Sequence, residues 1–464
     1  MEEINIENTV DLIHKKQAVF FSSQITLSSA FRIKKLKKLL KTIVQKEKEI
    51  HQALFKDLRK SSFESMTSET IFVEKEIRKM IQLLPSWNRP QRVQSSLLNF
   101  PSRDYIIPEP YGKTLLISPW NYPFQLAITP LVGAVAAGNT VVLKPSEFAP
   151  NTAKIINEII AEVFEPEHVT VLEGNVSMAT ALLKKRWDYI FFTGSTSIGK
   201  VVAKAAAEHL TPTTLELGGK SPCIVDASAP IKMTAKRIVW GKFLNCGQTC
   251  IAPDFLLVDK KIKAELTQQI IKEIQKAYGE DQSLSADYGR IIHEKHLSRL
   301  KDYLHGQNIV FGGNVAHDTL YFGPTIVDEP APDSPLMKEE VFGPILPIVS
   351  YESEQHLHEI LENRERPLAF YVFSKKNKFV NSLFGKYSFG GGVANDSIIH
   401  FANDNLPFGG IGNSGMGAYH GKHSLALFTH KKPVVKRSFW FDIPGRYAPY
   451  PKSLSFLKFL IKNL

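Results

Sequence analysis

Apolar residues in the first 85 positions recur at helical spacing. In segment 28–58 the apolar positions include Leu36, Leu39 and Ile43, with lysines between them, and segment 65–86 behaves similarly. Residues three and four apart share one face of a helix, so both segments predict amphipathic helices. Four prolines between 87 and 110 then exclude a long helix, and 103–107 predicts one strand of a projecting hairpin.

From residue 111 onward, short apolar runs alternate with helical patterns. The first series predicts strands at 114–118, 140–143, 169–172 and 189–192, and helices at 153–163, 179–185 and 198–208. A second series after residue 216 predicts strands at 222–225, 255–258, 345–349 and 369–373, and a long helix at 262–278. This alternation is typical of parallel sheets built from crossover units, so the sequence predicts two α/β lobes.

Composition narrows the class of protein without adding a motif. The 464 residues are 43% hydrophobic and 22% charged, which is ordinary globular usage. Only three cysteines are present (Cys223, Cys246 and Cys250), which excludes a disulfide scaffold and favours a reducing compartment. The acidic N-terminus is unlike a signal peptide, and apolar stretches such as 131–143 fall short of a membrane span. We therefore expect a soluble cytoplasmic protein.

The net charge of +11 permits nucleic acid or an anionic membrane surface as a partner. The lysines are spread over segments such as 34–48, and no nucleic-acid recognition motif accompanies them. We interpret them as a solvated basic surface and expect no nucleic-acid partner.

Two loops at predicted strand ends are candidates for binding a dinucleotide. Around Gly194, Ser195 and Gly199 a strand ends in small residues and a helix begins, which suits a phosphate, although an ordinary strand-to-helix turn explains it equally well. In Lys144-Pro-Ser-Glu147 the two charged side chains can reach a ribose, or they simply belong to a polar loop. A carboxylate there favours NAD, because it repels a 2′-phosphate.

Three other residues are candidates for chemistry, each with a plainer alternative. Cys250 lies in a turn-rich segment where a thiolate would be nucleophilic, although most free cysteines are buried and structural. A metal pair with Cys246 is rejected, because no second cluster supplies ligands. Glu216, between leucines and before two glycines, is a candidate general base, or else it pairs with Lys220. Asn121 is a candidate oxyanion donor or a turn cap.

Taken together and in order, these motifs resemble the NAD(P)-dependent aldehyde dehydrogenase superfamily over about residues 30–440. The short segment before the first long helix and the glycine-rich stretch 406–422 are similar to its class 3 branch, which acts on fatty and aromatic aldehydes. The motifs are Pro-Trp-Asn-Tyr-Pro at 119–123, Lys-Pro-Ser-Glu at 144–147, Phe-Thr-Gly-Ser-Thr at 192–196, Leu-Glu-Leu-Gly-Gly-Lys at 215–220, Gly-Gln-Thr-Cys at 247–250 and Glu-Val-Phe-Gly-Pro at 340–344.

The resemblance implies a fold and a domain division. It implies a Rossmann-type cofactor lobe (1–86 and 111–215), an α/β catalytic lobe (216–425), bridging segments (87–110 and 426–445) that pair in a homodimer, and a tail (446–464). By resemblance, Cys250 is the nucleophile, Glu216 the base for hydrolysis and Asn121 the oxyanion donor. The implied cofactor residues are Trp120, Lys144, Ser146, Glu147, Gly194, Ser195, Gly199, Glu340 and Phe342, and the implied substrate-pocket residues are Tyr122, Phe243, Thr249 and Phe401.

The implied reaction oxidises an apolar aldehyde to the acid through a cysteine thiohemiacetal and a thioester, with NAD and also NADP as cofactor and no metal. One rival hypothesis is a CoA-acylating enzyme of the same fold, and the presence of Glu216 at the base position favours hydrolysis over it. The other is a non-catalytic protein of the same fold, and the complete set of Cys250, Glu216 and Asn121 counts against it. The segment 452–464 places apolar residues at helical spacing among lysines, so it predicts a helix that packs on the protein or contacts an anionic membrane.

Overall fold

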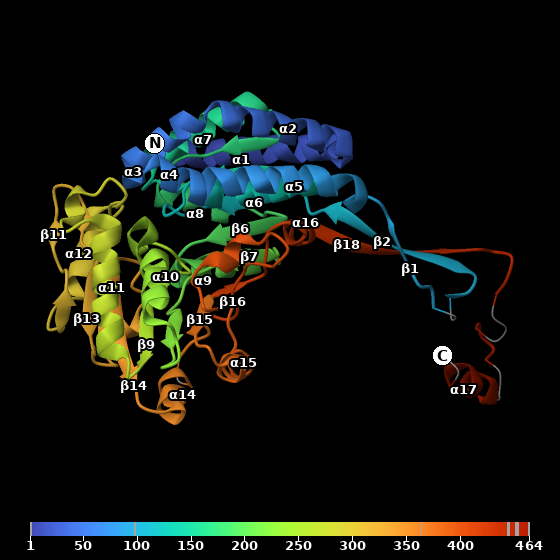
Figure 1. Ribbon diagram of the computed structural model, residues 1–464. Coiled ribbons are helices and arrows are strands. Elements are labelled where there is room, and N and C mark those ends of the chain that lie inside the picture. Colours follow the sequence, from blue (N-terminus) through green and yellow to red (C-terminus); the bar gives the residue numbers. More distant parts are fainter. Residues whose placement is uncertain (1, 97–98, 363, 443–445, 451–453, 463–464) are drawn as a thin grey trace.

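The computed structural model describes residues 2–96, 99–362, 364–442, 446–450 and 454–462. Two mainly parallel sheets, each covered by helices, form the body of the molecule, and an antiparallel arm extends away from it (Figure 1). The sequence therefore predicted the α/β class correctly. Among the described residues, no helix is both long and apolar enough to cross a membrane.

The first sheet has six strands in the order β17-β7-β6-β3-β4-β5, and all but β17 run parallel. From β3 the chain moves outward to β4 and β5, and it then returns to place β6 and β7 on the other side of β3. The carboxyl ends of β3 and β6 are thus the point where the strand order reverses, which is where open α/β sheets bind ligands. The bounds are β3 (Lys113–Ile117), β4 (Thr140–Lys144), β5 (Val169–Val171), β6 (Tyr189–Thr193), β7 (Thr213–Glu216) and β17 (Gly415–Met416).

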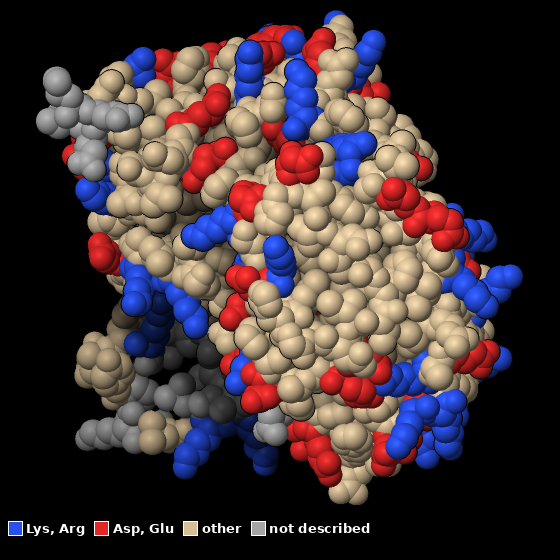
Figure 2. Space-filling view, turned by 90° about the vertical axis from the view of Figure 1, so that its left-hand side faces the viewer, with Lys and Arg blue, Asp and Glu red and all other residues tan. Residues whose placement is uncertain are grey.

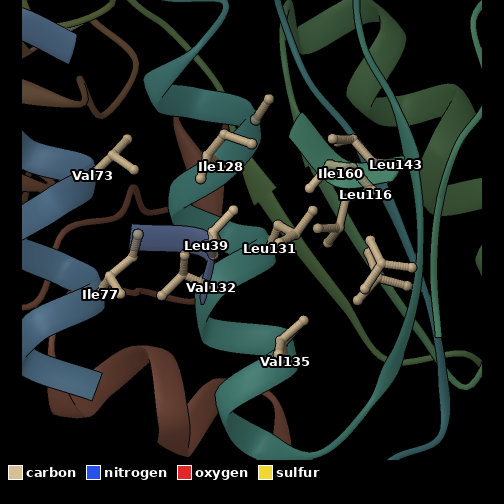
Figure 3. Packing of buried hydrophobic residues seen from close by; sticks show 14 of the residues in the cluster. Leu39, Val73, Ile77, Leu116, Ile128, Leu131, Val132, Val135, Leu143 and Ile160 are labelled. Carbon is tan, nitrogen blue, oxygen red and sulfur yellow. The ribbon is translucent and has the colours of Figure 1, made fainter. Parts of the chain in front are cut away.

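The helix α6 (Gln125–Ala137) is the centre of the first hydrophobic core. All of its residues are buried, since it lies between α5 (Ile71–Trp87) and strands β3 and β4 (Figure 3). A helix that is apolar on every side needs cover all round, and the N-terminal helices provide it. The other helices of this part are α1 (Glu2–Ser22), α2 (Ser29–Gln45), α3 (Glu47–Leu58), α4 (Ser62–Ser65), α7 (Pro150–Val163), α8 (Val176–Leu183) and α9 (Thr196–Glu208).

Two predicted N-terminal helices differ in detail from the structure. Segment 28–58 is broken at Lys46 into α2 and α3. Segment 65–86 begins with a π-helical turn at Met66–Thr70 before α5 starts. Such wide turns are rare, frequently occur at functional sites, and leave no periodic signal in a short sequence.

The second sheet has seven strands in the order β10-β13-β14-β9-β8-β15-β16, with only β10 antiparallel. The strands are β8 (Pro222–Val225), β9 (Phe255–Asp259), β10 (Ile309–Phe311), β13 (Thr325–Asp328), β14 (Ile345–Tyr351), β15 (Ala369–Phe373) and β16 (Gly391–Ala394), with β11 (Val315–Ala316) and β12 (Tyr321–Phe322) forming a small separate ladder. The helices of this part are α10 (Ile231–Phe243), α11 (Lys263–Tyr278), α12 (Glu294–Asp302), α13 (Pro335–Lys338), α14 (Glu354–Glu362) and α15 (Asn377–Lys386). Helix α16 (Lys422–Leu427) follows them in the chain and packs on α6 in the first core.

The arm is a three-stranded antiparallel sheet made from two distant segments. It contains β1 (Gln91–Val93), β2 (Ser102–Pro110) and β18 (Thr429–Arg437). Strand β2 is central, yet β1 covers only 104–106, so Pro108 and Pro110 need to pair on one side only. The predicted strand at 103–107 is therefore confirmed and is longer than expected.

The C-terminal segment is described only in part. Helix α17 (Ser455–Lys462) agrees with the helix predicted for the tail. Within the predicted stripe, residues 452 and 464 and the side chains of 457, 460 and 461 lie outside the described residues. The surface is mixed in charge on the side shown in Figure 2, where lysine and arginine lie among aspartate and glutamate.

A buried histidine makes the stability of the fold depend on pH. His168 is fully buried against Phe20, Phe31 and Phe164, with the Phe20 ring stacked on it at 5.3 Å. Burial lowers the pKa of His168 from 6.5 to about 4. The folded protein keeps this ring neutral while the unfolded chain protonates it, so stability falls as pH decreases from about 6.5 to about 4.

We predict that His168→Phe flattens this acid dependence. The unfolded chain protonates His168 below about pH 6.5 and the folded protein does not, so at ~1.4 kcal/mol for each pH unit the loss of stability is roughly 2 kcal/mol at pH 5. Urea unfolding at pH 7 and pH 5 measures it. His305→Gln, on an exposed side chain, is the control and should keep the wild-type dependence. An equal pH dependence in His168→Phe would disprove the assignment.

Candidate active site

Cys250 is placed by a left-handed turn between α10 and β9. Asn245 and Cys246 have φ of 52° and 53°, and Gly247 follows at 70°. At Gly247 a Cβ atom would lie 2.3 Å from the Gly343 carbonyl oxygen, so only glycine fits. Cys250 is partly exposed beyond this turn, whereas Cys246 is fully buried. Cys250 therefore lines a cavity, whereas Cys246 belongs to the closed core of the second sheet.

Glu216 ends β7 with its carboxylate buried and unpaired. Its exposed fraction is 3%, and neither oxygen has a hydrogen-bond partner among the described residues. Lys220 instead bonds to Asp254 and to the carbonyl oxygens of Leu336 and Glu339, so the alternative pairing with Glu216 does not occur. A buried carboxylate without a partner costs free energy, which points to a chemical role.

Burial raises the pKa values of the acidic groups around this point. It raises the pKa of Glu216 well above 4.5 and that of Glu340 to about 8. The pKa of the Cys250 thiol is also raised, first by burial and then by the negative charges of Glu340 and Glu216. The thiol is thus protonated at neutral pH and must lose its proton before it can act as a nucleophile.

Cys250 and Glu216 lie where two cavities meet. A wide cleft of about 520 Å³ and a narrow cavity of about 50 Å³ both include Leu126, Thr193, Glu216 and Cys250 in their walls. A group bound in the wide cleft and a small molecule in the narrow cavity would therefore come together at the thiol.

The wide cleft contains five of the predicted cofactor residues. Trp120 follows β3, and Gly194 and Ser195 follow β6, so they meet at the reversal point of the first sheet. Glu340 and Phe342 form the opposite wall, where the Phe342 ring contacts Trp120 edge to face at 5.3 Å. The helix α9 begins here, capped by Ser195, and its free N–H groups and positive end favour a phosphate.

The other four predicted cofactor residues do not line the cleft. Lys144 ends β4 beside β3 and forms a 2.5 Å ion pair with Glu147, and the Ser146 hydroxyl accepts a hydrogen bond from the Phe148 N–H. Gly199 is buried where a side chain would strike Leu217. Lys144, Ser146 and Glu147 share a sheet edge with the cleft, while Gly199 has a packing role.

The cleft fits a dinucleotide on its own features. It combines a helix N-terminus for phosphate, aromatic rings of Trp120 and Phe342 for a planar base, and a buried Thr193 hydroxyl without a partner among the described residues. The residues that would hold the cofactor are therefore present.

The narrow cavity contains three of the four predicted substrate-pocket residues. Tyr122, Thr249 and Phe401 line it, and the Tyr122 hydroxyl lies 2.7 Å from that of Thr249. Phe243 does not line it, because its side chain is 1% exposed in the core of the second sheet. Its place at the end of α10, close to Cys250 in sequence, does not bring it to the cavity. Sequence reasoning missed Ser68, Gln125, Leu126, Phe408, Tyr419 and His420, which also line the cavity.

Asn121 has one amide hydrogen engaged and one available. Its side-chain Nδ2 donates to the backbone carbonyl oxygen of Gln248 at 3.0 Å. Its own backbone carbonyl oxygen accepts a hydrogen bond from Asn245 Nδ2 at 2.7 Å. The side chain lies in the wall of the wide cleft beside Cys250. A primary amide has two hydrogens, so the second one can donate to an oxyanion.

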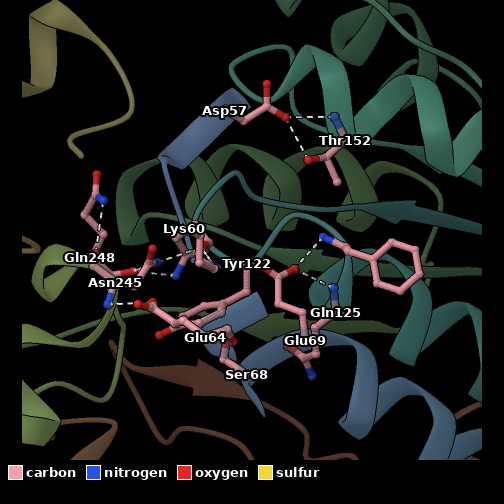
Figure 4. A network of polar contacts seen from close by, with 12 residues as sticks. Asp57, Lys60, Glu64, Ser68, Glu69, Tyr122, Gln125, Thr152, Asn245 and Gln248 are labelled. Atoms are coloured by element: carbon pink, nitrogen blue, oxygen red, sulfur yellow. Dashed lines mark hydrogen bonds and ion pairs between the residues drawn. The ribbon is translucent and has the colours of Figure 1, made fainter. Parts of the chain in front are cut away.

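A buried polar network joins this site to the N-terminal helices (Figure 4). Lys60 pairs with Glu69 at 2.5 Å, and the second Glu69 oxygen accepts from the N–H groups of Phe124 and Gln125 at the start of α6. Glu64 accepts from the Asn245 N–H at 2.9 Å. Sequence analysis missed these residues, although acidic side chains within an apolar helical stripe were a usable signal.

Comparison with known proteins identifies the family of this chain. Residues 7–434 match the model of the aldehyde dehydrogenase family. The chain belongs to the aldehyde dehydrogenase family. Its similarity to relatives named as family 3 members places it in the class 3 branch.

Two relatives and one solved structure show the extent of the match. The 4,4′-diaponeurosporen-aldehyde dehydrogenase of Staphylococcus aureus is 44% identical, covering 96% of this chain and 97% of the relative. Aldehyde dehydrogenase family 3 member A2 of Mus musculus is 43% identical, covering 93% and 90%. The substrate-bound structure of Staphylococcus aureus AldH has a TM-score of 0.94 at 42% identity, covering 98% and 99%.

Proposed function

We propose that the protein oxidises an apolar aldehyde to the carboxylic acid, with NAD or NADP as the hydride acceptor. The supporting observation is the meeting of the two cavities at Cys250 and Glu216. The narrow cavity is lined mainly by apolar and aromatic side chains, among them Ile251, Ile398 and Phe401, which suits an aliphatic or aromatic aldehyde.

In the first half-reaction the Cys250 sulfur attacks the aldehyde carbon after giving its proton to a base. The thiohemiacetal oxyanion then accepts hydrogen bonds from the Asn121 amide and the Cys250 N–H. One such donor is typically worth about 3–4 kcal/mol in the transition state. The bound dinucleotide supplies the hydride-accepting ring, and loss of hydride from the former aldehyde carbon leaves a thioester on Cys250.

In the second half-reaction Glu216 removes a proton from water, and the water oxygen attacks the thioester. The carbon–sulfur bond then breaks, Glu216 passes its proton to the Cys250 sulfur, and the carboxylic acid is released. A raised pKa makes the buried Glu216 carboxylate a stronger base than an exposed glutamate. A free carboxylate in this place supports hydrolysis over transfer of the acyl group to CoA.

We infer that both NAD and NADP are accepted. Glu147 favours free ribose hydroxyls over a 2′-phosphate, yet its ion pair with Lys144 partly neutralises it. Relatives support both possibilities, since a betaine aldehyde dehydrogenase structure contains NAD and a dimeric relative from Rattus norvegicus is named NADP-preferring. We also assign 1–86 and 111–215 to the cofactor lobe and 216–425 to the catalytic lobe, with the exception of β17, which pairs with β7 in the sheet of the cofactor lobe.

The direct test is NADH formation from an apolar aldehyde by purified protein. We predict that Cys250→Ala abolishes the increase in absorbance at 340 nm while NAD binding, measured by calorimetry, persists. Cys246→Ala removes a buried thiol outside both cavity walls and should keep most activity. An essential Cys246 with a dispensable Cys250 would refute the assignment.

Glu216→Gln separates the two half-reactions. We predict a pre-steady-state burst of NADH followed by turnover slowed about 100-fold or more, because general base catalysis typically contributes 10²–10⁴-fold. Stopped-flow measurement with and without CoA also tests the rival activity, since CoA should not accelerate wild-type turnover. Loss of the burst itself would mean that Glu216 also accepts the thiol proton.

We propose that the protein is a homodimer. The arm β1-β2-β18 extends from the body (Figure 1), and the side chains of Phe439 and Trp440, which follow β18 in the chain, are exposed. Exposed aromatic residues on a projecting element are typical of an interface. One similar relative carries the word dimeric in its name.

Sedimentation equilibrium at micromolar concentration should give about twice the chain mass of 52.2 kDa. Trp440→Asp should shift the equilibrium toward monomer, because it places a charge in the proposed interface. Val19→Asp, which changes an exposed apolar side chain on α1, is the control and should remain dimeric. A monomeric wild-type protein would rule the dimer out.

We further propose weak contact of the C-terminal segment with anionic membranes. In α17 the described residues Lys458 and Lys462 lie near the exposed ring of Phe459, a combination that suits a lipid interface. Liposomes with anionic lipid at low salt should sediment the full chain more than a chain ending at Tyr450. Equal sedimentation would leave α17 with a packing role only.

A further inference from the structure

Glu64 is a buried acidic residue that the proposed reaction does not use. It lies on α4, and its carboxylate accepts the Asn245 N–H at 2.9 Å (Figure 4). The residue is 8% exposed, so this hydrogen bond is shielded from water. Glu64 is absent from the walls of both cavities, which means that it acts on the site only through other residues.

Asn245, which Glu64 binds, has a strained backbone and contacts several residues of the site. Asn245 and Cys246 both have left-handed backbone angles, which cost free energy in residues with a Cβ atom. The Asn245 side chain donates to the carbonyl oxygens of Asn121 and Gln248. The backbone N–H of Asn245 therefore binds Glu64, while its side-chain amide holds the backbone of Asn121 and of Gln248.

We propose that Glu64 is a positioning residue that holds the Asn245 turn, and through it Asn121 and Cys250, in the geometry required for attack on the aldehyde. An ionised carboxylate makes a stronger hydrogen bond to an N–H group than a neutral acid does. The Asn245 turn is consequently held most strongly when the Glu64 carboxylate is ionised. This inference rests on the proposed function, because it concerns the same reaction.

The charge of Glu64 changes within the working pH range. Its pKa is raised to about 7, with burial as the main cause. Lys60 and the Asn245 N–H lower this pKa in part, and the Glu69 and Asp287 carboxylates contribute to the increase. Protonation below this pH weakens the hydrogen bond, so activity should decline as pH falls from 8 to 6. The titratable groups that face Glu64 are Lys60, Glu69, Tyr122, Cys246, Tyr278 and Asp287.

The test compares Glu64→Gln, which keeps an acceptor without charge, with Glu64→Leu, which removes the acceptor. A displaced reacting group can cost about 100-fold in rate, so we expect kcat to fall about 100-fold in Glu64→Leu and about tenfold in Glu64→Gln. The KM for NAD should stay unchanged. The decline from pH 8 to 6 should be shallower in Glu64→Gln than in the wild type, because the contribution of Glu64 is removed while those of Glu216 and Glu340 remain. The control is Glu49→Gln, an exposed glutamate on α3, which should behave as wild type.

A second readout needs neither aldehyde nor cofactor. The rate at which iodoacetamide alkylates Cys250, followed by mass spectrometry of the Cys250 peptide, should fall in both variants. Its rise between pH 6 and 8 should be less steep in Glu64→Gln than in the wild type, because only the ionisation of the Cys250 thiol then contributes. The amplitude of cooperative urea unfolding normalises kcat for the fraction of folded protein. Wild-type values of normalised kcat, alkylation rate and pH profile in Glu64→Gln would overturn the proposal. A wild-type protein that forms no NADH would instead refute the proposed function.

Discussion

The geometry of the site depends on one buried ion pair. Lys60 and Glu69 are 1% and 0% exposed, and they lie on segments that precede both sheets in the chain. Glu69 binds the first N–H groups of α6, and Lys60 also donates to the carbonyl oxygen of Asn121 at 3.4 Å. Removing one partner of a buried pair typically costs about 3–5 kcal/mol, because the other charge is left uncompensated. The N-terminal helices therefore fix the start of α6 and the position of Asn121, the proposed oxyanion donor.

The chemistry of the site follows from the exclusion of water around it. Burial raises the pKa values of Cys250, Glu216 and Glu340 together, so each group keeps its proton to a higher pH than it would in water. The same burial makes each hydrogen bond to the oxyanion stronger than it would be in water. A dry site costs stability, and the left-handed turn at Asn245 adds to that cost.

The sequence predicted the periodic parts of the fold and the residues that belong to contiguous motifs. Strands such as β4 and β15 were found because buried parallel strands are unbroken apolar runs. Cys250, Glu216 and Asn121 were found through motifs whose spacing is fixed along the chain. The short edge strand β17 and the π-turn at Met66–Thr70 were missed because each has too few residues for a period to be visible.

Side-chain placement was predicted less well than chain order. Phe243 lies close to Cys250 in sequence, yet α10 turns its ring into the core of the second sheet. Ser68, Gln125 and His420 come from three distant segments and meet only in the folded protein. Glu64 and Asn245 are 181 positions apart, so no local pattern could have paired them.

The position of β17 has a consequence for how the chain folds. Residues 415 and 416 form the outer strand beside β7 and pair directly with Glu216 and Leu215, about two hundred positions earlier. Contacts between residues so far apart in the chain form slowly. Until β17 is in place, the outer edge of β7 is uncovered and can pair with strands of other chains. On a ribosome, the first sheet stays open at β7 until nearly the whole chain has been made. The cofactor lobe is thus not a separate folding unit, and Glu216 gains its final surroundings among the last contacts to form.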